Sequence, residues 1–506
     1  MVKKKTKFLS AIDKKQIEEL KNNSIICYGH FNIVHPGHLR FLEYAKKQGD
    51  QLIVALLADK DLPKGLYFSQ EERSLGLFNT DLVDHIIILD SGNLSDLTKL
   101  IKPESLVFGK DMQKKYPPAI AKAIKVLDIN GGRVIFHSGD IRYSNSRILA
   151  DTPALIEEEK KNTFIKSCQN QKILKASLLK HIENFSNKKI LVIGDSIVDQ
   201  YVACDALGMS AEAPVLVVKE LGSKNYLGGA AIVASHVKAL GGDCEFISIS
   251  GDDKLGKFLR SNLANLGINS KIIIDPSRPT THKIRYMVDQ QKLFRVSRLS
   301  DSFLDDELED SIILSIQESC QYVDAIIVSD FVYGLITPKI LDAIKELAKN
   351  KELYTVGDVQ CSTQVGSASK FENFSIISAT EREVRMSLNN QEGGLEDIAN
   401  QLMEVTQCNS MLLKLGSEGF ISYEVQDRVD EPLREQFPAL VASPLDLTGA
   451  GDSLLAAITL SISAGASLME SSAIGASVAG LAVKKMGNIP VSKDELLNYI
   501  NSEIQW

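Results

Sequence analysis

Two histidines follow the first apolar run of the chain at a spacing that suits phosphate chemistry. Residues 28–38 read Tyr-Gly-His-Phe-Asn-Ile-Val-His-Pro-Gly-His, so His35 and His38 stand three residues apart. An expected strand ends near Gly29 and an expected helix begins at Gly37, where backbone N–H groups and the helix dipole favour anions. Gly29 lets the backbone approach a phosphate closely. Two imidazoles there could stabilise the charge that builds on a phosphoryl group during displacement.

Other interpretations of this histidine pair stay open. The pair could be half of a metal site, although no Cys, third His or Glu stands at ligand spacing. Two unrelated surface histidines would show the same spacing. The full combination of strand, glycine, phenylalanine, both histidines and helix is more specific than any one element.

A second candidate site lies near the other end of the chain. Residues 446–452 read Asp-Leu-Thr-Gly-Ala-Gly-Asp and precede a long apolar helical run. Two glycines at a helix start expose successive backbone amides, which form an anion pocket. Asp452 follows the last glycine and is placed to take a proton from a hydroxyl that attacks a bound phosphate. The alternative is an aspartate that merely complements the helix dipole.

Both sites need parallel sheets to position them. In the first part of the chain, wholly apolar runs predict strands at 24–28, 51–57, 85–89, 105–108 and 133–136, with helices at 37–47 and 69–78. Apolar strands separated by helices are typical of a parallel sheet that is covered on both faces. We therefore predict an α/β chain whose residues 1–150 form a small doubly wound, Rossmann-like domain.

Residues 151–187 are rich in Lys, Glu, Asn and Gln, and they predict a solvated helical connector. Residues 188–506 again alternate strands and helices, with strands expected at 190–195, 245–249, 325–328, 354–356, 375–377 and 410–413. The stretch 202–226 differs, because the strand run 215–218 has no helix after it. It predicts a small β excursion that forms a lid or a dimer contact.

Composition narrows the classes of partner. The 57 Lys and Arg against 65 Asp and Glu give a net charge of −8, which disfavours nucleic acid. Seven scattered cysteines without a Cys-x-x-Cys pair indicate free thiols in a reducing cytoplasm. No secretory signal opens the sequence, and polar residues interrupt the apolar run 454–469, so we expect no membrane segment.

The N-terminal motif resembles the HxGH nucleotidyltransferase superfamily, in particular its cytidylyltransferase-like group, and the likeness extends to about residue 150. Members join a nucleoside triphosphate to a phosphorylated small molecule and release pyrophosphate. ATP and CTP users share the motif, so the base stays open. Asn32 stands where the family usually has Asp, which removes a charge. Besides catalytic His35 and His38, the resemblance implies nucleotide or phosphate contacts from Gly29, Phe31, Lys64, Arg73, Gly109, Asp111, Ser144 and Ser146.

The C-terminal part resembles the ribokinase-like (PfkB) sugar kinase family over residues 188–506, through 194–199, Gly228-Gly229-Ala230-Ala231 and 446–452. The resemblance implies ATP and Mg²⁺, with Asp452 as the catalytic base. It also implies that Thr448, Gly449, Ala450 and Gly451 hold phosphate, that Asp199, Gly228 and Gly229 contact the sugar, and that Glu383 acts indirectly at the metal. The double glycine could instead be a tight helix–sheet contact.

Segments 210–215 and 329–334 look like the kinase half of the bifunctional heptose-phosphate kinase/nucleotidyltransferase family, with the two halves here in reversed order. The likeness implies that Lys283, Arg285 and Arg295 help to hold a sugar phosphate, which Arg can grip with two hydrogen bonds. A charged hairpin exposed to water is the alternative. Ile232, Tyr333 and Thr380 depart from the family's residues, so "sugar kinase" is better supported than "heptose kinase".

We therefore expect a bifunctional enzyme. One half would phosphorylate a sugar, and the other would use ATP or CTP to activate a sugar 1-phosphate for a surface glycan. Small sugar phosphates and nucleoside triphosphates would be its partners, with a possible homodimer through the lid. The alternatives are a fused polyol-phosphate cytidylyltransferase, or an N-terminal domain that senses nucleotides without catalysis.

Overall fold

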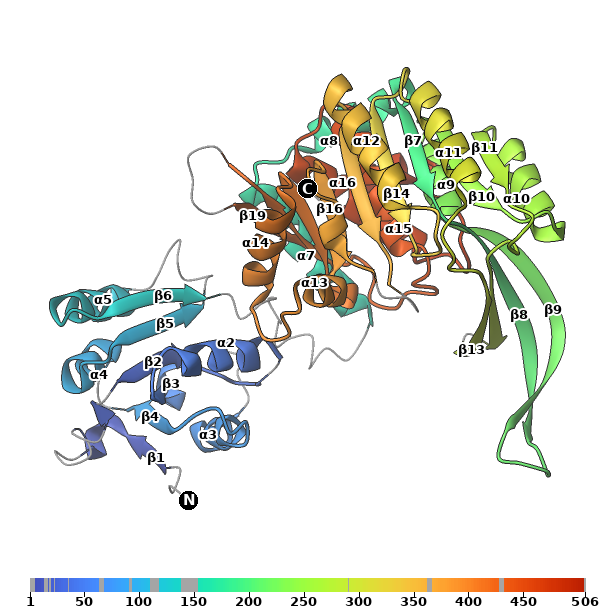
Figure 1. Ribbon diagram of the computed structural model, residues 1–506. Coiled ribbons are helices and arrows are strands. Elements are labelled where there is room, and N and C mark those ends of the chain that lie inside the picture. Colours follow the sequence, from blue (N-terminus) through green and yellow to red (C-terminus); the bar gives the residue numbers. More distant parts are fainter. Residues whose placement is uncertain are drawn as a thin grey trace. The chain divides into compact units, whose positions relative to one another are not determined.

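The computed structural model places the two candidate sites in different units. One compact unit comprises Met1–Ala150 with Asn390–Ile398, and the other comprises Asp151–Asn389 with Ala399–Trp506 (Figure 1). The structure describes residues 5–12, 17, 20–21, 23–34, 36–62, 68–90, 93–109, 118–137, 153–289, 291–361, 366–426 and 432–504.

The N-terminal unit is a parallel sheet with strand order β1-β4-β3-β2-β5-β6. Its strands are β1 (Lys5–Phe8), β2 (Ser24–Gly29), β3 (Gln51–Leu57), β4 (His85–Leu89), β5 (Ser105–Gly109) and β6 (Arg133–His137). Its helices are α2 (Pro36–Lys47), α3 (Gln70–Phe78), α4 (Leu94–Ile101) and α5 (Pro118–Ile129). Separate apolar clusters form with α2 and α3 and with α4 and α5. The predicted doubly wound domain is confirmed.

The strand order sets where a ligand can bind in this unit. From central β2 the chain adds β3 and β4 on one side, and then it crosses to β5 and β6 on the other. In such sheets ligands bind outside the carboxyl ends of the strands at this switch point. Gly29 and Gly109 end β2 and β5, so both predicted glycines lie at this place. The short edge strand β1 was not predicted, because Lys5–Phe8 contains no apolar run.

The C-terminal unit has a larger sheet of order β11-β10-β7-β14-β15-β16-β17-β18-β19. Along this order, the strands from β11 to β17 pair in parallel, and β18 and β19 add an antiparallel edge. The strands are β7 (Lys189–Gly194), β10 (Asp243–Ser250), β11 (Asn269–Ile274), β14 (Ala325–Asp330), β15 (Tyr354–Val359), β16 (Ile376–Thr380), β17 (Ser410–Lys414), β18 (Phe420–Glu424) and β19 (Leu433–Phe437).

Helices cover both faces of this sheet (Figure 1). Helices α9, α15 and α16 pack together over the largest apolar cluster, and α11 and α12 pack against each other. The helices are α9 (Ala230–Ala239), α10 (Lys254–Asn265), α11 (Asp306–Ser319), α12 (Pro338–Lys351), α13 (Glu381–Leu388), α14 (Leu395–Thr406), α15 (Ala450–Ser463), α16 (Leu468–Ala482) and α17 (Lys493–Asn498). The run at 454–469 is thus a buried core helix and the turn after it.

The segment after residue 152 is helical, with α7 (Pro153–Asn170) and α8 (Lys175–Glu183). Phe164, Leu178, Ile182 and Phe185 are fully buried and belong to the same apolar cluster as the sheet of the C-terminal unit. Their spacing places few but large apolar side chains on the inward faces of polar helices. The prediction of a solvated connector is therefore wrong for the described residues 153–187, which form part of the C-terminal unit.

A second sheet of order β13-β12-β8-β9 forms the lid, and in Figure 1 β8 and β9 project from the body of this unit. Its strands are β8 (Ser196–Met209), β9 (Leu216–Gly229), β12 (His282–Val288) and β13 (Gln291–Arg298). The predicted β lid is confirmed, and it is larger than expected, because the hairpin 282–298 joins the excursion at 202–226. The pairing of β12 with β8 joins segments far apart in the sequence, and no local pattern of residues in either strand indicates its partner.

Candidate active sites

The C-terminal unit gathers charged side chains at the carboxyl edge of its sheet. Asp330 ends β14, Asp358 lies near the end of β15, and Lys414 ends β17. A Cβ atom on Gly194, which ends β7, would lie 1.9 Å from the Ser329 carbonyl oxygen, so β7 and β14 approach as closely as glycine allows. These two strands flank the switch point of this sheet, where ligands bind in open α/β folds.

Asp452 lies in the first turn of α15, directly after the glycine loop. Gly449, the N-cap, has φ = +82°, a left-handed conformation that favours glycine. Burial raises the pKa of Asp452 to about 7, and nearby Asp358 acts in the same direction, while Gln360 and Lys414 lower it. A carboxylate with a pKa near 7 is suited to act as a general base at neutral pH. The role of Asp452 as the catalytic base stays a prediction.

Three residues that the sequence analysis missed surround Asp452. Gln360 Nε2 donates to Asp452 Oδ1 at 2.8 Å and to Asp358 Oδ2 at 3.0 Å. Lys414 Nζ donates to the other oxygen of Asp358 at 2.5 Å. They lie at the ends of two separate strands, and none of them belongs to a recognisable sequence motif. A polar residue directly after an apolar strand was the signal that could have found them.

Asp199 of β8 is buried beside the double glycine. It forms an ion pair with Arg285, and Asn488 Nδ2 donates to Asp199 Oδ2 at 2.7 Å. A Cβ atom on Gly228 would lie 2.3 Å from that same Asp199 oxygen. Gly229 has φ = +60° and begins α9. The structure thus brings together Asp199, Gly228 and Gly229 as expected, and a sugar contact by them stays a prediction.

The three predicted basic residues of the lid lie on one of its faces. The register pairs Lys283 with Asp199, and Arg285 with both Tyr201 and Arg295. Residues paired in this way share a face, which we call the polar face of the lid, defined by Asp199, Tyr201, Lys283, Arg285 and Arg295. Arg285 is buried, with its guanidinium 5.3 Å from the Tyr201 ring centre, whereas Arg295 is exposed.

Lys283 is buried between aromatic rings. Its ammonium nitrogen lies 5.0 Å from the ring centre of Phe331 and 5.2 Å from that of Tyr333. Within the described parts of the chain it forms neither an ion pair nor a hydrogen bond. A buried cation that lies against aromatic rings and has no ion-pair partner is suited to bind an anionic group of a ligand.

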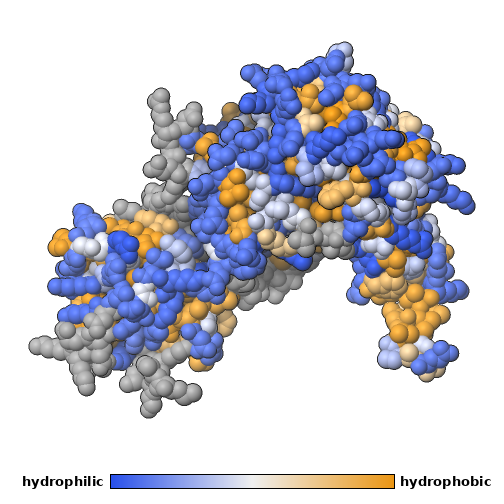
Figure 2. All heavy atoms as spheres, in the orientation of Figure 1, coloured by the Kyte–Doolittle hydropathy of each residue, from blue (hydrophilic) through white to orange (hydrophobic). Residues whose placement is uncertain are grey.

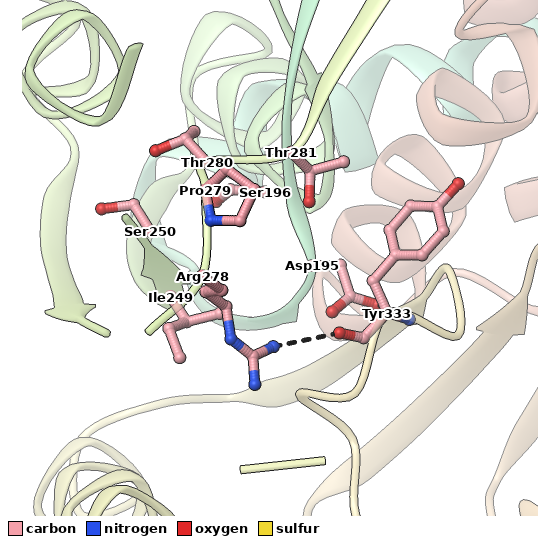
Figure 3. Close-up of a pocket in the computed structure, with 9 residues that line it drawn as sticks. All are labelled: Asp195, Ser196, Ile249, Ser250, Arg278, Pro279, Thr280, Thr281 and Tyr333. Atoms are coloured by element: carbon pink, nitrogen blue, oxygen red, sulfur yellow. Dashed lines mark hydrogen bonds between the residues drawn. The ribbon is translucent and has the colours of Figure 1, made fainter. Parts of the chain in front are cut away.

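A small pocket lies next to this aromatic pair, at the end of β7 (Figure 3). Arg278 crosses it and donates to the Tyr333 carbonyl oxygen at 3.2 Å. Asp195 Oδ2 accepts hydrogen bonds from the Phe331 and Tyr333 backbone N–H groups at 2.9 and 3.3 Å, which fixes the turn that carries both rings. Hydroxyl groups complete the lining, from Ser196, Ser250, Thr280 and Thr281.

The lid also contacts the glycine loop, residues 446–451. Lys292 Nζ of β13 donates to Asp446 Oδ1 at 2.8 Å and to Thr448 Oγ1 at 2.9 Å. The Tyr201 hydroxyl donates to Asp446 Oδ2 at 2.6 Å. Burial alone would raise the pKa of Asp446, but these hydrogen bonds outweigh it and lower the pKa to about 2. Asp446 therefore carries a charge that ties the loop to the lid.

Glu383 caps a helix. Its two carboxylate oxygens accept the backbone N–H groups of Cys361 at 3.1 Å and Thr380 at 2.7 Å, and Thr380 caps α13 in return. Among the residues that the structure describes, no group of three or more His, Cys, Asp or Glu could hold a metal ion. The indirect metal role of Glu383 stays a prediction.

In the N-terminal unit, Gly29, Phe31 and His38 lie together at the end of β2. His38 Nδ1 donates to the Ile33 carbonyl oxygen at 3.1 Å, and the Phe31 and His38 ring centres are 5.0 Å apart. A Cβ atom on Gly29 would lie 3.0 Å from the Phe31 ring. This arrangement requires a proton on Nδ1 of His38 and so orients its imidazole.

The contacts of Arg73 differ from the phosphate contact that the sequence predicts. It is buried, and its three nitrogens donate to the carbonyl oxygens of His30, Leu57 and Phe68 and to Asp59. In this arrangement Arg73 holds the loop carbonyls instead of a phosphate, because its donors are directed at protein oxygens. The predicted residues His35, Lys64, Asp111, Ser144 and Ser146 lie outside the described residues.

Comparison with known proteins shows the family. The model of the pfkB family of carbohydrate kinases matches residues 187–495, more than half of the chain, and the chain belongs to this family. A cytidylyltransferase-like family model matches residues 26–173. The kinase-type domain and the nucleotidyltransferase-type domain are therefore both present, and the nucleotidyltransferase-type domain comes first.

Curated relatives carry the name bifunctional protein HldE. The protein of Campylobacter jejuni serotype O:6 is 32% identical over 314 residues, and that of Desulfatibacillum aliphaticivorans is 29% identical over 317 residues. Each alignment covers 62% of this chain, and it spans 64% and 63% of those relatives' lengths, less than two thirds.

Solved structures support the ribokinase-like fold alone. Phosphofructokinase-2 of Escherichia coli, in complex with substrates and products, aligns with a TM-score of 0.51 and 15% identity. A protein described as a putative ribokinase of Agrobacterium tumefaciens aligns with a TM-score of 0.51 and 16% identity. Each covers 62% of this chain and 98% of the other. In the described part of the chain, no helix is long and apolar enough to cross a membrane.

Proposed function

We propose that this chain is a bifunctional enzyme of nucleotide-sugar synthesis. Its C-terminal half phosphorylates a sugar, in our proposal a heptose phosphate at C1, with ATP. Its N-terminal half transfers a nucleotidyl group from ATP or CTP to the sugar 1-phosphate, which gives an activated sugar for a surface glycan. The observation that best supports this proposal is the position of Asp452. It is a buried carboxylate with a pKa near 7 that directly follows the amides of Gly449–Gly451.

In the kinase reaction, a sugar hydroxyl oxygen attacks the γ-phosphorus of ATP. Asp452 accepts the hydroxyl proton as the new O–P bond forms. The bond between the γ-phosphorus and the bridging oxygen breaks, and ADP leaves with that electron pair. The backbone N–H groups of the Gly449–Gly451 loop stabilise the charge on the transferred group.

The residues of the lid favour a phosphorylated sugar as the substrate. Asp199 and the double glycine would bind sugar hydroxyls, and Asn488 lies between Asp199 and the phosphate loop, since a Cβ atom on Gly449 would lie 2.8 Å from Asn488 Oδ1. Lys283 is buried and has no anionic partner within the described chain, which favours a substrate with an anionic group on this side. A phosphorylated sugar is thus better supported than a heptose in particular.

In the N-terminal half, an oxygen of the sugar 1-phosphate attacks the α-phosphorus of the nucleoside triphosphate. The bond to the β-phosphate breaks, and pyrophosphate leaves with the electron pair. His35 and His38 would donate hydrogen bonds to the phosphate oxygens. The place of His38 at the switch point of the sheet, with its ring oriented by the Ile33 carbonyl, supports this assignment.

Mg²⁺ enters this proposal as the ion that accompanies the nucleoside triphosphates. The oxygens of Glu383 accept two backbone hydrogen bonds, and the described residues hold no group that could bind a metal by itself. Bound with its nucleotide, Mg²⁺ would neutralise phosphate charge.

We also propose a homodimer through the lid. The side of the lid opposite the polar face, here called its apolar face, is defined by Val202, Cys204, Val218, Ile284, Tyr286, Phe294 and Val296. Phe294 and Val296 are 52% and 37% exposed, and Figure 2 shows apolar residues gathered on the projecting strands. A second lid would cover this surface. The seven unpaired cysteines support a cytoplasmic enzyme.

A screen of sugar phosphates with ATP and with CTP tests the proposal when ADP and pyrophosphate are followed separately. ADP release that depends on a sugar phosphate supports the kinase half. Pyrophosphate release with a sugar 1-phosphate supports the transferase half, and release with a polyol phosphate and CTP would favour the cytidylyltransferase alternative. A chain that forms ADP but never pyrophosphate would favour an N-terminal sensing domain.

A further inference from the structure

A lysine at the end of β17 lies beside the predicted phosphate loop. The Lys414 side chain is 12% exposed, and its Nζ atom lies 3.7 Å from where a Cβ atom on Gly451 would stand. Gly451 belongs to the first turn of α15, where the N–H groups carry positive partial charge. A fixed ammonium group at this place is repelled by the helix terminus, and an anion between the two would relieve that repulsion.

The ammonium group is only partly satisfied by the protein. Among the residues that the structure describes, Asp358 is the sole hydrogen-bond acceptor of Lys414. An ammonium carries three N–H donors, so two of them stay available next to the Gly449–Gly451 loop. Burying donors without acceptors is unfavourable unless a ligand supplies oxygens. A phosphate group supplies several.

Hydrogen bonds through Asp358 fix the position of Lys414. The other oxygen of Asp358 accepts a hydrogen bond from the amide group of Gln360, which also donates to Asp452. Burial would lower the pKa of Lys414, but Asp358 and Glu383 outweigh burial and raise it, so the group stays charged. The ion pair by itself explains little, because a buried ion pair is often no more stabilising than apolar residues of the same size.

We propose that Lys414 is a further catalytic residue of the kinase half, which donates hydrogen bonds to the phosphoryl group as it moves from ATP to the sugar. This inference rests on the proposed kinase function. Lys414 adds the positive charge of its ammonium group to the N–H donors of the Gly449–Gly451 loop. Asp358 positions Lys414, and Gln360 positions Asp358 relative to the base.

The test compares Lys414→Met with the wild type and with Lys188→Met in the full-length chain. Lys188 forms a similar ion pair, with its Nζ 3.0 Å from Asp324 Oδ1, but it precedes β7 at the opposite edge of the sheet. Initial rates of ADP release are measured from pH 6 to about pH 9, with ATP and the best sugar phosphate of the screen. Tryptic resistance and thermal unfolding report folding.

Loss of a donor to the transferred group costs about 10²–10³ in rate. We expect kcat of Lys414→Met to fall by about that factor, with KM of the sugar phosphate changed less than about threefold, and Lys188→Met to match the wild type. If Lys414 acted only by lowering the pKa of Asp452, the pH profile of Lys414→Met would shift to higher pH, and its rate would approach that of the wild type as the pH rises toward 9. A loss that persists at pH 9 therefore supports direct contact with phosphate.

A Lys414→Met variant that matches the wild type at pH 9 overturns the inference while the kinase function stands. If Lys414→Met unfolds, Lys414→Arg and Lys414→Gln decide: an arginine variant that is much faster than the glutamine variant supports the charge, and equal rates overturn it. A wild type that forms no ADP with any sugar phosphate would overturn the proposed kinase function and this inference together. If Asp452→Asn loses ADP release and Lys414→Met retains it, the proposed kinase function stands and the inference on Lys414 is refuted.

Discussion

Gln360 Nε2 lies 2.8 Å from Asp452 Oδ1 and 3.0 Å from Asp358 Oδ2, so one amide group donates to two buried carboxylates. Both amide protons are used, and the two acids cannot approach each other or turn away. This hydrogen bond lowers the pKa of Asp452, while burial and the charge of Asp358 raise it. The amide thus tunes the residue that we propose as the base.

Replacing the base tests the kinase half. Asp452→Asn should lower kcat for ADP release by about 10²–10⁴, because a positioned general base is lost. ATP affinity should stay within about threefold of the wild type, since the amides of Gly449–Gly451 remain. Calorimetric ATP binding beside steady-state rates checks both. Retention of more than about half of the wild-type rate would refute the role of Asp452.

The pH profile of the kinase follows from the pKa of Asp452. The base acts when it is deprotonated, so kcat/KM should fall as the pH drops below about 7. Gln360→Leu removes a hydrogen bond that lowers this pKa, so its acid limb should move to higher pH. Gln171→Leu is the matched control, because Gln171 donates to Glu435 at 3.0 Å elsewhere in the unit. An unmoved limb in Gln360→Leu would contradict the proposed tuning.

The sequence predicted much of this site but not its centre. The glycine loop, Asp452, Asp199 and the double glycine lie in short contiguous motifs, whose residue types alone indicate a helix start or a close approach of the backbone. Gln360 and Lys414 lie at the ends of separate strands, and Asn488 lies between α16 and α17, so only the folded chain brings them near Asp452 and Asp199. Such long-range pairing is set by packing, which a single sequence does not encode in any local pattern.

The place of the domain boundary can be tested by truncation. A fragment of residues 151–506 should fold and retain kinase activity, whereas residues 188–506 should be unstable. The shorter fragment loses four fully buried side chains, Phe164, Leu178, Ile182 and Phe185. Each contributes about 1.5–3 kcal/mol of burial, which together is comparable to the about 5–15 kcal/mol that stabilises a domain. Thermal unfolding and ADP release of both fragments check this, and equal stability would be contrary evidence.

The histidines should affect only the other reaction. His35→Ala and His38→Ala should each lower kcat for pyrophosphate release by about 10²–10³ with little change in nucleotide affinity. Kinase rates of the same variants should be unchanged, and Asp452→Asn should release pyrophosphate normally. A metal site instead predicts loss on chelation and recovery with zinc. Full-rate pyrophosphate release in both histidine variants would remove this assignment.

Lys283 should matter for the charge of the substrate. Lys283→Met should raise KM for a phosphorylated sugar by about tenfold or more, because hydrogen bonds to charged groups contribute about 1.5–3 kcal/mol. KM for an unphosphorylated analogue should change little. Lys219→Met, an exposed position on β9 of the same lid, is the control. An equal effect on both substrates would show that Lys283 supports the fold of the lid and does not recognise phosphate.

The two faces of the lid limit how its length can vary. Along β8 and β12, Asp199, Tyr201, Lys283 and Arg285 point to one side, and Val202, Cys204 and Ile284 point to the other. Inserting or deleting one residue ahead of these positions would exchange the sides, so charged groups would meet the apolar surface and apolar groups the substrate. Changes of two residues preserve the alternation. Natural variation of these strands should therefore occur in pairs of residues, or as a single residue absorbed by a bulge.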